Sequence, residues 1–406
     1  MDPEMINEVL SNKSGHYGKP KLSLINLISG GLVVLEGEKW AKHRRIINPA
    51  FHVGKLRGML PAFSASCGEL VDRWEQQISS NEFYELDVWP EMQALTGDVI
   101  SRTAFGSSYE EGRQIFQLLT VLDDLNVQIF QKLYIPGYKY LPTKENLRRR
   151  ELNREVRNIL KHMIEEREKI MRAGGESKND LLGLLMESNY IESQEEGVGL
   201  TIEEVIEECK LFYFAGQETT SSLLTWTMVL LAMHPSWPER AREEVLQVFQ
   251  KNKPEFDGLN QLKTVTMILY EVLRLYPPVP GLLRCTRKKL QIRPGTTLPA
   301  EAQLLLPFLL AHHDPDLWGN DVEEFKPDRF IEGVSKATKN RVSLTPFGWG
   351  PRICIGQNFA MTEAKIAMAM ILQHFTFELS PSYAHAPFTL ATLRPQHGAQ
   401  LILRTF

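Results

Sequence analysis

Apolar residues recur with a helical period along most of the chain. In Lys144–Ile170 they alternate with Lys, Arg and Glu at intervals near 3.6 residues, which predicts an amphipathic helix. A longer helix is predicted to begin at a capping box made by Thr201 and Glu204 and to continue to Met233. At a rise of ~1.5 Å per residue this helix is roughly 48 Å long, so much of its length must be buried.

Shorter patterns complete a mainly helical α+β chain. Between Leu282 and His312 the sequence changes to short β-type runs broken by Pro and Gly, which predicts a small sheet region. The acidic, glycine-containing run Ser188–Gly199 predicts a loop. We expect one domain over residues 1–406. Further helices are predicted at residues 239–250, 262–275 and 358–374.

Composition and charge exclude several classes of protein. The formal net charge of −4 over 406 residues is near neutral, whereas nucleic-acid binders usually carry a strong basic excess. Four cysteines cannot form a disulfide framework and fit a reducing compartment. The amino terminus lacks the basic and apolar regions of a signal peptide. The longest apolar run, Leu223–Met233, is shorter than the about 20 residues of a membrane span, so the chain as written is expected to be soluble or peripheral.

The loop from Phe347 to Gly356 carries the most distinctive chemistry. Cys354 lies just before a predicted helix, where unpaired N–H groups and the positive end of the helix dipole stabilise a thiolate. Gly350 and Gly356 permit a positive φ and lack a Cβ, so the backbone can approach a flat, bulky partner, and Arg352 can pair with an anionic group on it. A single thiolate is a poor zinc site and a good axial ligand for haem iron. The alternative is a buried structural cysteine in a glycine turn.

This loop resembles the haem-binding signature of the cytochrome P-450 monooxygenases, Phe-x-x-Gly-x-Arg-x-Cys-x-Gly. The resemblance extends over nearly the whole chain, and the wording of several motifs is most similar to plant microsomal members that oxidise terpenoids and hormones. It implies a cytochrome P-450 fold, with haem b between the long helix and the loop and with Cys354 as the axial ligand of the iron. All five fixed positions are matched, by Phe347, Gly350, Arg352, Cys354 and Gly356.

The segment Ala215–Thr220 places an acid and an alcohol in the middle of the long helix. A buried carboxylate is costly unless it is hydrogen-bonded, and Gly216 weakens the helix by about 1 kcal/mol relative to Ala. On the residues alone, a packing glycine with a threonine bonded back to the preceding turn is an equal alternative. The resemblance implies instead that a kink opens a pocket for dioxygen, and that Glu218 and Thr219 relay protons through water.

A second pair of residues is predicted to be structural. Glu271 and Arg274 lie three apart on one helix face, which on its own is more often a surface ion pair worth about 0.2 to 0.5 kcal/mol. The resemblance adds Arg329 and implies a cluster of Glu271, Arg274 and Arg329 that locks the loop carrying Cys354.

Four further side chains are implied in haem binding. Trp40 and Arg44 resemble the Trp-x-x-x-Arg of the family, and with Arg284 and Arg352 they would hold the two propionates by charge-assisted hydrogen bonds. For Arg44 the alternative is that His43–Arg45 is simply an exposed basic run.

The reaction implied is insertion of one oxygen atom from O2 into a lipophilic small molecule that is terpenoid-like or hormone-like. No glycine-rich nucleotide fingerprint is visible, so electrons are expected from NADPH through an NADPH-cytochrome P-450 reductase that docks near Cys354. By resemblance the location is the cytosolic face of the endoplasmic reticulum membrane. The substrate contacts are implied at residues 23–34, 212–215, 279–283 and 390–392.

One departure from the family pattern keeps other functions open. The cysteine usually lies further along the chain, after an anchor, a first helix and two strands, so the sequence is expected to be amino-terminally truncated. The strand expected at Gln303–Leu310 would then expose an apolar edge. A non-catalytic fragment that binds haem weakly or only a partner is one alternative. A haem-thiolate isomerase or dehydratase is another, against which the retained Glu218 and Thr219 argue.

Overall fold

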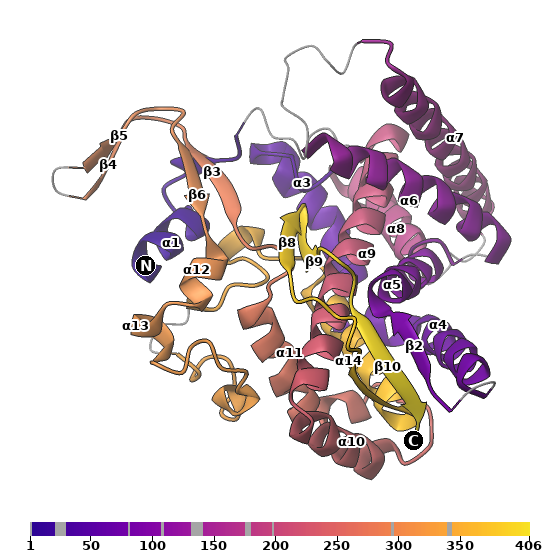
Figure 1. The fold of residues 1–406 in the computed structure, drawn as a ribbon. Coiled ribbons are helices and arrows are strands. Elements are labelled where there is room, and N and C mark those ends of the chain that lie inside the picture. Colours follow the sequence, from indigo (N-terminus) through magenta and orange to yellow (C-terminus); the bar gives the residue numbers. More distant parts are fainter. Residues whose placement is uncertain are drawn as a thin grey trace. The chain divides into compact units, whose positions relative to one another are not determined.

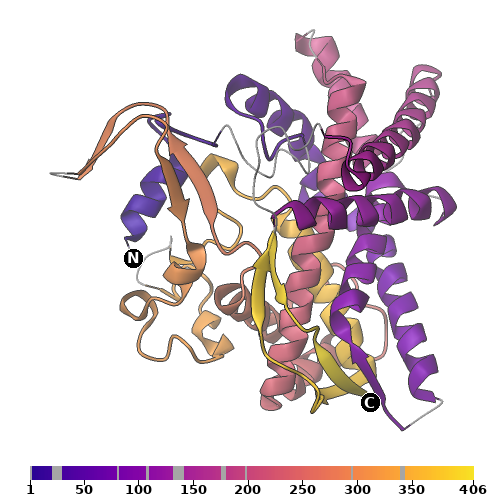
Figure 2. The ribbon, with the colours of Figure 1, turned by 45° about the horizontal axis from the view of Figure 1, so that its top comes forward.

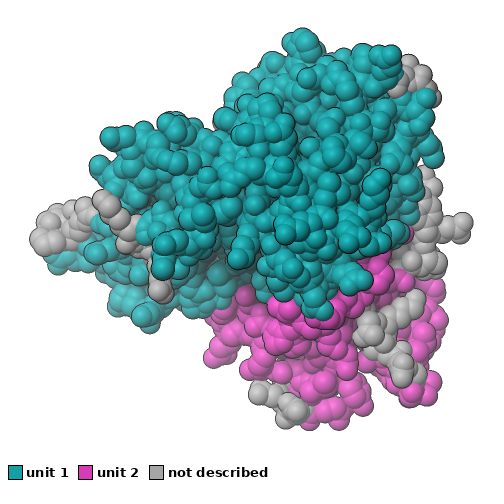
Figure 3. Space-filling view, turned by 90° about the horizontal axis from the view of Figure 1, so that it is seen from below, with its two compact units in different colours: residues 1–21, 63–95, 218–406 teal, residues 22–62, 96–217 magenta. Residues whose placement is uncertain are grey.

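The computed structural model describes nine stretches of the chain, which by backbone contacts belong to two compact units (Figure 3). Unit 1 comprises Met1–Lys21, Phe63–Leu95 and Glu218–Phe406, and unit 2 comprises Leu22–Ala62 and Thr96–Gln217. The single domain expected from the sequence stays a prediction. The described residues are 2–20, 30–79, 82–106, 109–130, 141–174, 180–196, 199–293, 296–338 and 343–406.

In the described residues of unit 2, the regular secondary structure is all helical. The helix expected from Lys144 is confirmed as α7, and the Thr143 side chain caps it by accepting a hydrogen bond of 3.2 Å from the Asn146 N–H. Parts of α4 (Val53–Ser79), α5 (Val88–Phe105) and α9 (Ile202–Met233) also belong to this unit. Its other elements are α3 (Gly37–Ile47), η1 (Asn48–Phe51), α6 (Tyr109–Phe130), α7 (Lys144–Arg172) and α8 (Leu181–Glu196).

The loop predicted at Ser188–Gly199 is wrong for most of its length, because α8 continues to Glu196. Its acidic and polar residues contain no Pro or Gly before Gly197, so nothing in the sequence ends the helix earlier. The Asn189 side chain then binds both backbone groups of Leu200, which fixes the return of the chain towards α9.

The long helix is confirmed as α9 (Ile202–Met233), and it runs without interruption past Gly216 (Figure 1). Both bonds of the capping box form: the Thr201 N–H donates to Glu204 Oε2 at 3.0 Å, and the Glu204 N–H donates to Thr201 Oγ1 at 3.2 Å. Every residue from Thr220 to Leu231 is buried, as expected for a helix inside the core.

Unit 1 contains the remaining helices. The helices predicted at residues 239–250, 262–275 and 358–374 are confirmed with shifts of up to three residues at their ends. They are α1 (Pro3–Ser11), α4 (Val53–Ser79), α5 (Val88–Phe105), α10 (Ser236–Phe249), α11 (Lys263–Leu275), α12 (Phe308–His312), α13 (Pro315–Trp318) and α14 (Gln357–His374), with single turns η3 (Gly258–Asn260), η4 (Pro327–Phe330) and η6 (Gly350–Arg352).

Four small antiparallel sheets lie in unit 1, with strand orders β1-β3-β6, β2-β10-β7, β4-β5 and β8-β9. The β4–β5 hairpin projects beyond β3 and β6 in both ribbon views (Figures 1 and 2). The strands are β1 (Tyr17–Gly18), β2 (Tyr84–Asp87), β3 (Leu282–Thr286), β4 (Leu290–Arg293), β5 (Thr296–Leu298), β6 (Gln303–Leu306), β7 (Phe375–Leu379), β8 (Pro387–Leu390), β9 (Thr392–Pro395) and β10 (Gln400–Thr405).

The sheet region expected between Leu282 and His312 is confirmed, but the strand expected at Gln303–Leu310 ends at Leu306. Pro307 follows with no N–H to donate to a ladder, and α12 begins at the next residue. β6 lies at the edge of its sheet, and Leu305 on it is 65% exposed. Among the described residues, no helix is both long enough and apolar enough to cross a membrane.

A small apolar cluster packs against the cysteine loop. Residues of α1, β1, β6 and α12 pack together, with Ile6, Tyr17 and Phe308 among those that are fully buried. Trp349, two residues before the loop's Pro351, packs against this cluster. The end of α1 therefore lies directly beside the start of the functional loop.

Candidate active site

Cys354 is the accessible cysteine of the described chain. Its side chain is exposed between η6 and α14, and its N–H donates a hydrogen bond of 2.8 Å to the Phe347 carbonyl oxygen. Cys67, Cys209 and Cys285 are buried. Burial, followed by the negative charge of Glu208, raises the pKa of the Cys209 thiol to about 12. The alternative of a buried structural cysteine is therefore wrong for Cys354, whose side chain is exposed.

Two glycines give the cysteine loop its shape. Gly348 and Gly350 have φ values of +74° and +73°, which L side chains rarely adopt. A Cβ on Gly350 would also lie 2.6 Å from the carbonyl oxygen of Leu10 at the end of α1. The close approach that Gly350 permits is thus to the backbone of this chain. Gly356 could also take a positive φ but does not use this freedom: it is the N-cap of α14, with φ at −87°.

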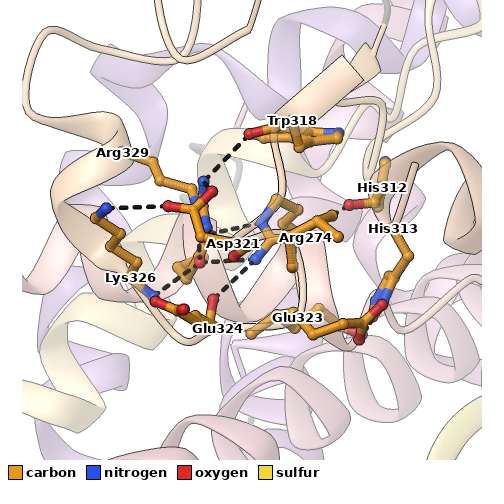
Figure 4. Close-up of polar contacts among 12 residues, drawn as sticks. Arg274, His312, His313, Trp318, Asp321, Glu323, Glu324, Lys326 and Arg329 are labelled. Carbon is orange, nitrogen blue, oxygen red and sulfur yellow. Dashed lines mark hydrogen bonds and ion pairs between the residues drawn. The ribbon is translucent and has the colours of Figure 1, made fainter. Parts of the chain in front are cut away.

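Glu271 and Arg274 form a fully buried ion pair on α11, and Arg329 of η4 completes a cluster with them (Figure 4). Arg274 binds both carboxylate oxygens of Glu271 at 2.8 Å, and Arg329 Nε donates to Oε1 at 3.3 Å. The exposed fraction of both Glu271 and Arg274 is 0%, so the alternative of a surface ion pair is wrong.

The cluster also fastens the segment that leads from α12 to η4. The carboxylate of Asp321 accepts hydrogen bonds from Arg329 at 2.8 Å and from Lys326 at 2.9 Å, and these bonds lower its pKa to about 2. The Lys326 N–H donates to Glu271 Oε1 at 2.9 Å. Arg274 donates to three carbonyl oxygens, those of His312 at 3.0 Å, Val322 at 2.7 Å and Glu324 at 3.2 Å.

The carboxylate of Glu218 is buried and anchored from two other elements. Its Oε2 accepts a hydrogen bond of 2.9 Å from the Thr392 hydroxyl on β9, and its Oε1 accepts one of 3.3 Å from Gln93 on α5. The next residue, Thr219, is partly exposed. The sequence placed Thr392 in a substrate-contacting segment, but nothing in its local pattern indicated a bond to Glu218.

The glycine of this helix has a packing role in the structure. A Cβ on Gly216 would lie 3.1 Å from the side chain of Ile100 on α5, so the missing side chain lets these two helices approach. This observation favours the packing alternative for Gly216 itself. The kink and the dioxygen pocket stay predictions.

The predicted propionate ligands lie in both units. Trp40 and Arg44 are one turn apart on α3 in unit 2 and are partly buried. The alternative of an exposed basic run at His43–Arg45 is wrong for His43. This residue is buried, and its Nδ1 lies 2.6 Å from Glu208 Oε1. In unit 1, Arg284 on β3 and Arg352 in η6 are partly buried. Their convergence on one group stays a prediction.

One buried acid was missed by the sequence reasoning. Glu363 on α14 is 1% exposed, and burial raises the pKa of its carboxyl well above the usual value. The Thr220 hydroxyl faces it and partly offsets this rise, although neither carboxyl oxygen makes a hydrogen bond of good geometry to any residue that the structure describes. No clear signal was available in the sequence, because Thr362 and Lys365 flank Glu363 and suggest an exposed polar position.

The site offers one protein ligand, the Cys354 thiol, to a bound cofactor. Among the residues that the structure describes, no three His, Cys, Asp or Glu side chains are placed to share a metal ion. One exposed thiol just before a helix fits haem iron, which Cys354 would hold through a thiolate bond.

The comparisons with known proteins decide the family. The family model described as Cytochrome P450 matches residues 1–403. This chain belongs to the cytochrome P450 family. Family membership implies haem with a cysteine thiolate ligand, and it makes the chain a P450 monooxygenase by its relatives.

Several plant P450s are similar over nearly the whole chain. Cytochrome P450 CYP72A616 of Paris polyphylla is 62% identical, over 99% of this chain and 78% of the relative. Cytochrome P450 72A15 of Arabidopsis thaliana is 57% identical, over 99% and 78%. The 11-oxo-beta-amyrin 30-oxidase of Glycyrrhiza uralensis is 55% identical, over 99% and 77%.

Solved structures confirm the P450 fold. Retinoic acid-bound cyanobacterial CYP120A1 superposes with a TM-score of 0.85 at 25% identity, over 98% of this chain and 86% of that one. The heme domain of cytochrome P450DA gives a TM-score of 0.86 at 25% identity, over 100% and 86%. The mainly helical architecture with small sheets, as predicted from the sequence, is therefore that of a P450.

Proposed function

We propose that this P450 inserts one atom of dioxygen into a terpenoid-like substrate, with Cys354 as the ligand of the haem iron. The observation that carries the proposal is the exposed thiol of Cys354 at the start of α14, inside a loop that matches the family signature. When bound, the haem supplies the redox chemistry of oxygen activation, and the protein supplies position and electrostatics.

The chain's own residues would bind and orient the cofactor. Trp40, Arg44, Arg284 and Arg352 would hold the propionates through charge-assisted hydrogen bonds. The Glu271, Arg274 and Arg329 cluster would keep the surrounding segment rigid, since each of its charges is paired inside the fold.

Glu218 and Thr219 would move protons. The Glu218 carboxylate is held by hydrogen bonds to its two oxygens from Thr392 and Gln93, so its direction is fixed. The Thr219 hydroxyl is partly open on the next position of α9 and would pass a proton from water to the reacting oxygen. Fixed geometry of this kind contributes to rate because the donor is already in place.

The substrate class is proposed from one relative. The Glycyrrhiza uralensis relative is named an 11-oxo-beta-amyrin oxidase, which supports a pentacyclic terpenoid for this chain. Of the proposed contact segments, Val279–Leu283 is partly buried with Leu283 exposed, and Ala215 is exposed on α9. Phe212 and Tyr213 of the second segment are buried, as are Leu390 and Thr392 of the last one. In the first proposed segment, residues 23–34, positions 23–29 lie outside the described residues.

The electron donor is proposed to be an NADPH-cytochrome P-450 reductase at the cytosolic face of the endoplasmic reticulum. Its support is the absence of a nucleotide-binding fingerprint in the sequence and the location usual for plant members of the family. Basic side chains near Cys354 would meet the acidic surface of the reductase.

The test is turnover of the haem-loaded chain with reductase, NADPH and a panel of pentacyclic terpenoids under isotopically labelled dioxygen. Product carrying one labelled oxygen supports the proposal, and unlabelled product formed without NADPH would support an isomerase or dehydratase. No product and no oxygen-dependent NADPH consumption would support the non-catalytic fragment.

A further inference from the structure

His312 connects the buried charge cluster to the loop that carries Cys354. It is the last residue of α12 and is 0% exposed. Its carbonyl oxygen accepts a hydrogen bond of 3.0 Å from Arg274 Nη1 (Figure 4). Its ring Nε2 accepts one of 3.1 Å from the Thr345 N–H. One residue thus contacts the cluster through its main chain and the loop through its side chain.

The direction of the second bond fixes the state of the ring. The Thr345 N–H can only donate, so Nε2 must be an acceptor and the ring proton must lie on Nδ1 of a neutral imidazole. Burial, followed by the positive charge of Arg274, lowers the pKa of His312 to about 3, so the ring stays neutral at physiological pH.

The same geometry leaves a buried N–H group that has no partner in the described part of the chain, a cost that an apolar side chain at this position would avoid. Nδ1 of His312 is buried and has no hydrogen-bond partner among the described residues. A buried donor without a partner is destabilising, and an apolar side chain would fill the space without it. A histidine at this position is explained by the acceptor that it offers to Thr345.

From Thr345 the hydrogen bonds continue to the cysteine. Thr345 is 2% exposed, and its carbonyl oxygen accepts a hydrogen bond of 2.9 Å from the Gly348 N–H. The carbonyl oxygen of Phe347, inside that turn, accepts the 2.8 Å bond from the Cys354 N–H. A shift of Thr345 would therefore reach the backbone of Cys354 through two short turns.

We infer that His312 is a positioning residue for the Cys354 thiolate, because it joins the Arg274 cluster to the first turn of the cysteine loop. The inference rests on the proposed function, in which Cys354 ligates haem. Burial and the neighbouring sequence alone would not require a histidine at position 312.

Two substitutions separate the hydrogen bond from the packing. His312→Leu fills the space with an apolar side chain of similar size and removes the acceptor. His312→Gln can instead offer its amide oxygen to the Thr345 N–H. His313→Leu is the matched control. His313 fastens the same segment through Glu323 at 3.1 Å and the Leu275 carbonyl oxygen at 3.1 Å, and both of these contacts lie away from the cysteine loop.

The experiment follows the decay of the red-shifted band of the reduced carbon-monoxide complex in the haem-loaded full chain. We expect His312→Leu to lose the band about fivefold faster than wild type, the factor that corresponds to one hydrogen bond of typical strength. His312→Gln and His313→Leu should stay within about twofold of wild type. Equal lifetimes for His312→Leu and wild type, or a folded His312→Gln as short-lived as His312→Leu, would overturn the inference.

Hydrogen exchange of the haem-free chain gives a readout that does not depend on the cofactor. The Thr345 amide should exchange faster in His312→Leu than in wild type, and His312→Gln should restore its protection. If wild type shows no red-shifted band, the proposed function fails, and the exchange of Thr345 still reports whether the link exists. If the Thr345 amide is equally protected in all variants, the link itself is refuted.

Discussion

The hydroxyl of Thr392 donates a hydrogen bond of 2.9 Å to Oε2 of Glu218, and both side chains are buried. Thr392 begins β9, and Glu218 lies in the middle of α9. Thr392 also ends a segment that we propose to contact the substrate. One hydrogen bond thus connects the proposed substrate region with the proposed proton relay.

Thr392→Val should uncouple the enzyme. Valine keeps the shape of threonine but cannot donate a hydrogen bond. The Glu218 carboxylate would therefore lose one of the two hydrogen bonds that fix its orientation. We expect product per NADPH to fall about fivefold, as one lost hydrogen bond implies, with more hydrogen peroxide released. The control is Thr389→Val on the exposed side of β8, which should leave coupling unchanged. Unaltered coupling in Thr392→Val would show that this bond does not serve the relay.

Arg274→Met should destabilise the protein strongly. The substitution leaves the Glu271 carboxylate buried without its bidentate partner, at a cost of about 3 to 5 kcal/mol in the free energy of unfolding. Arg148→Met removes an exposed ion pair to Glu151 and should cost less than about 1 kcal/mol. Chemical unfolding of both variants measures the difference. Similar midpoints for the two would contradict the structural role of the cluster.

Glu363 should make stability fall as pH rises. Its pKa is raised in the folded state, so the folded chain holds this proton at pH values where the unfolded chain has released it. The contribution is fully present below about pH 4.5, and it is lost progressively above that, by up to about 1.4 kcal/mol per pH unit.

Glu363→Gln should therefore flatten the dependence of unfolding free energy on pH and raise stability at pH 7 to 8. Denaturant unfolding at pH 5, 6, 7 and 8 provides the test. Glu332→Gln, at an exposed position, should leave the slope of wild type in place. A slope that is unchanged in Glu363→Gln would mean that this carboxyl does not hold its proton in the folded chain.

Gly350→Ala should be more damaging than Gly348→Ala. Both positions have a positive φ, so both variants pay a backbone cost of roughly 1 to 2 kcal/mol. A Cβ at position 348 meets nothing within 4 Å, whereas one at position 350 would lie 2.6 Å from the Leu10 carbonyl oxygen. Thermal unfolding should therefore show a lower Tm for Gly350→Ala. Equal Tm values would indicate that α1 does not press on the loop.

Local patterns predicted the parts of the fold that depend on local chemistry. The capping box at Thr201, the stop before Pro277 and the loop before α14 all follow from residues that are close in sequence. The strands β7 to β10 were not predicted. β10 pairs with β2 and β7, which are distant along the chain. β8 and β9 form a hairpin around Ala391, with no Gly, Asn or Pro at the turn to signal it.

The contacts that tune the site were beyond local reasoning for the same reason. The partners of Glu218 come from α5 and β9, and the partner of Thr345 is a histidine 33 residues earlier. Sequence spacing identified Cys354 and brought Glu271 together with Arg274, because those residues lie in one loop or on one helix face. It indicated that Gly350 can take a positive φ and allow a close approach, but it gave no information that the neighbour is the Leu10 backbone.

The most direct test of the account is the reduced carbon-monoxide difference spectrum of the haem-loaded chain, recorded for wild type, Cys354→Ser and Cys285→Ser. Cys285 is a buried cysteine whose thiol bonds to the Lys19 carbonyl oxygen, so serine there should preserve the spectrum. We predict the red-shifted band of a thiolate ligand in wild type and Cys285→Ser, and its loss in Cys354→Ser. The same band in Cys354→Ser, or no band in wild type, would contradict it.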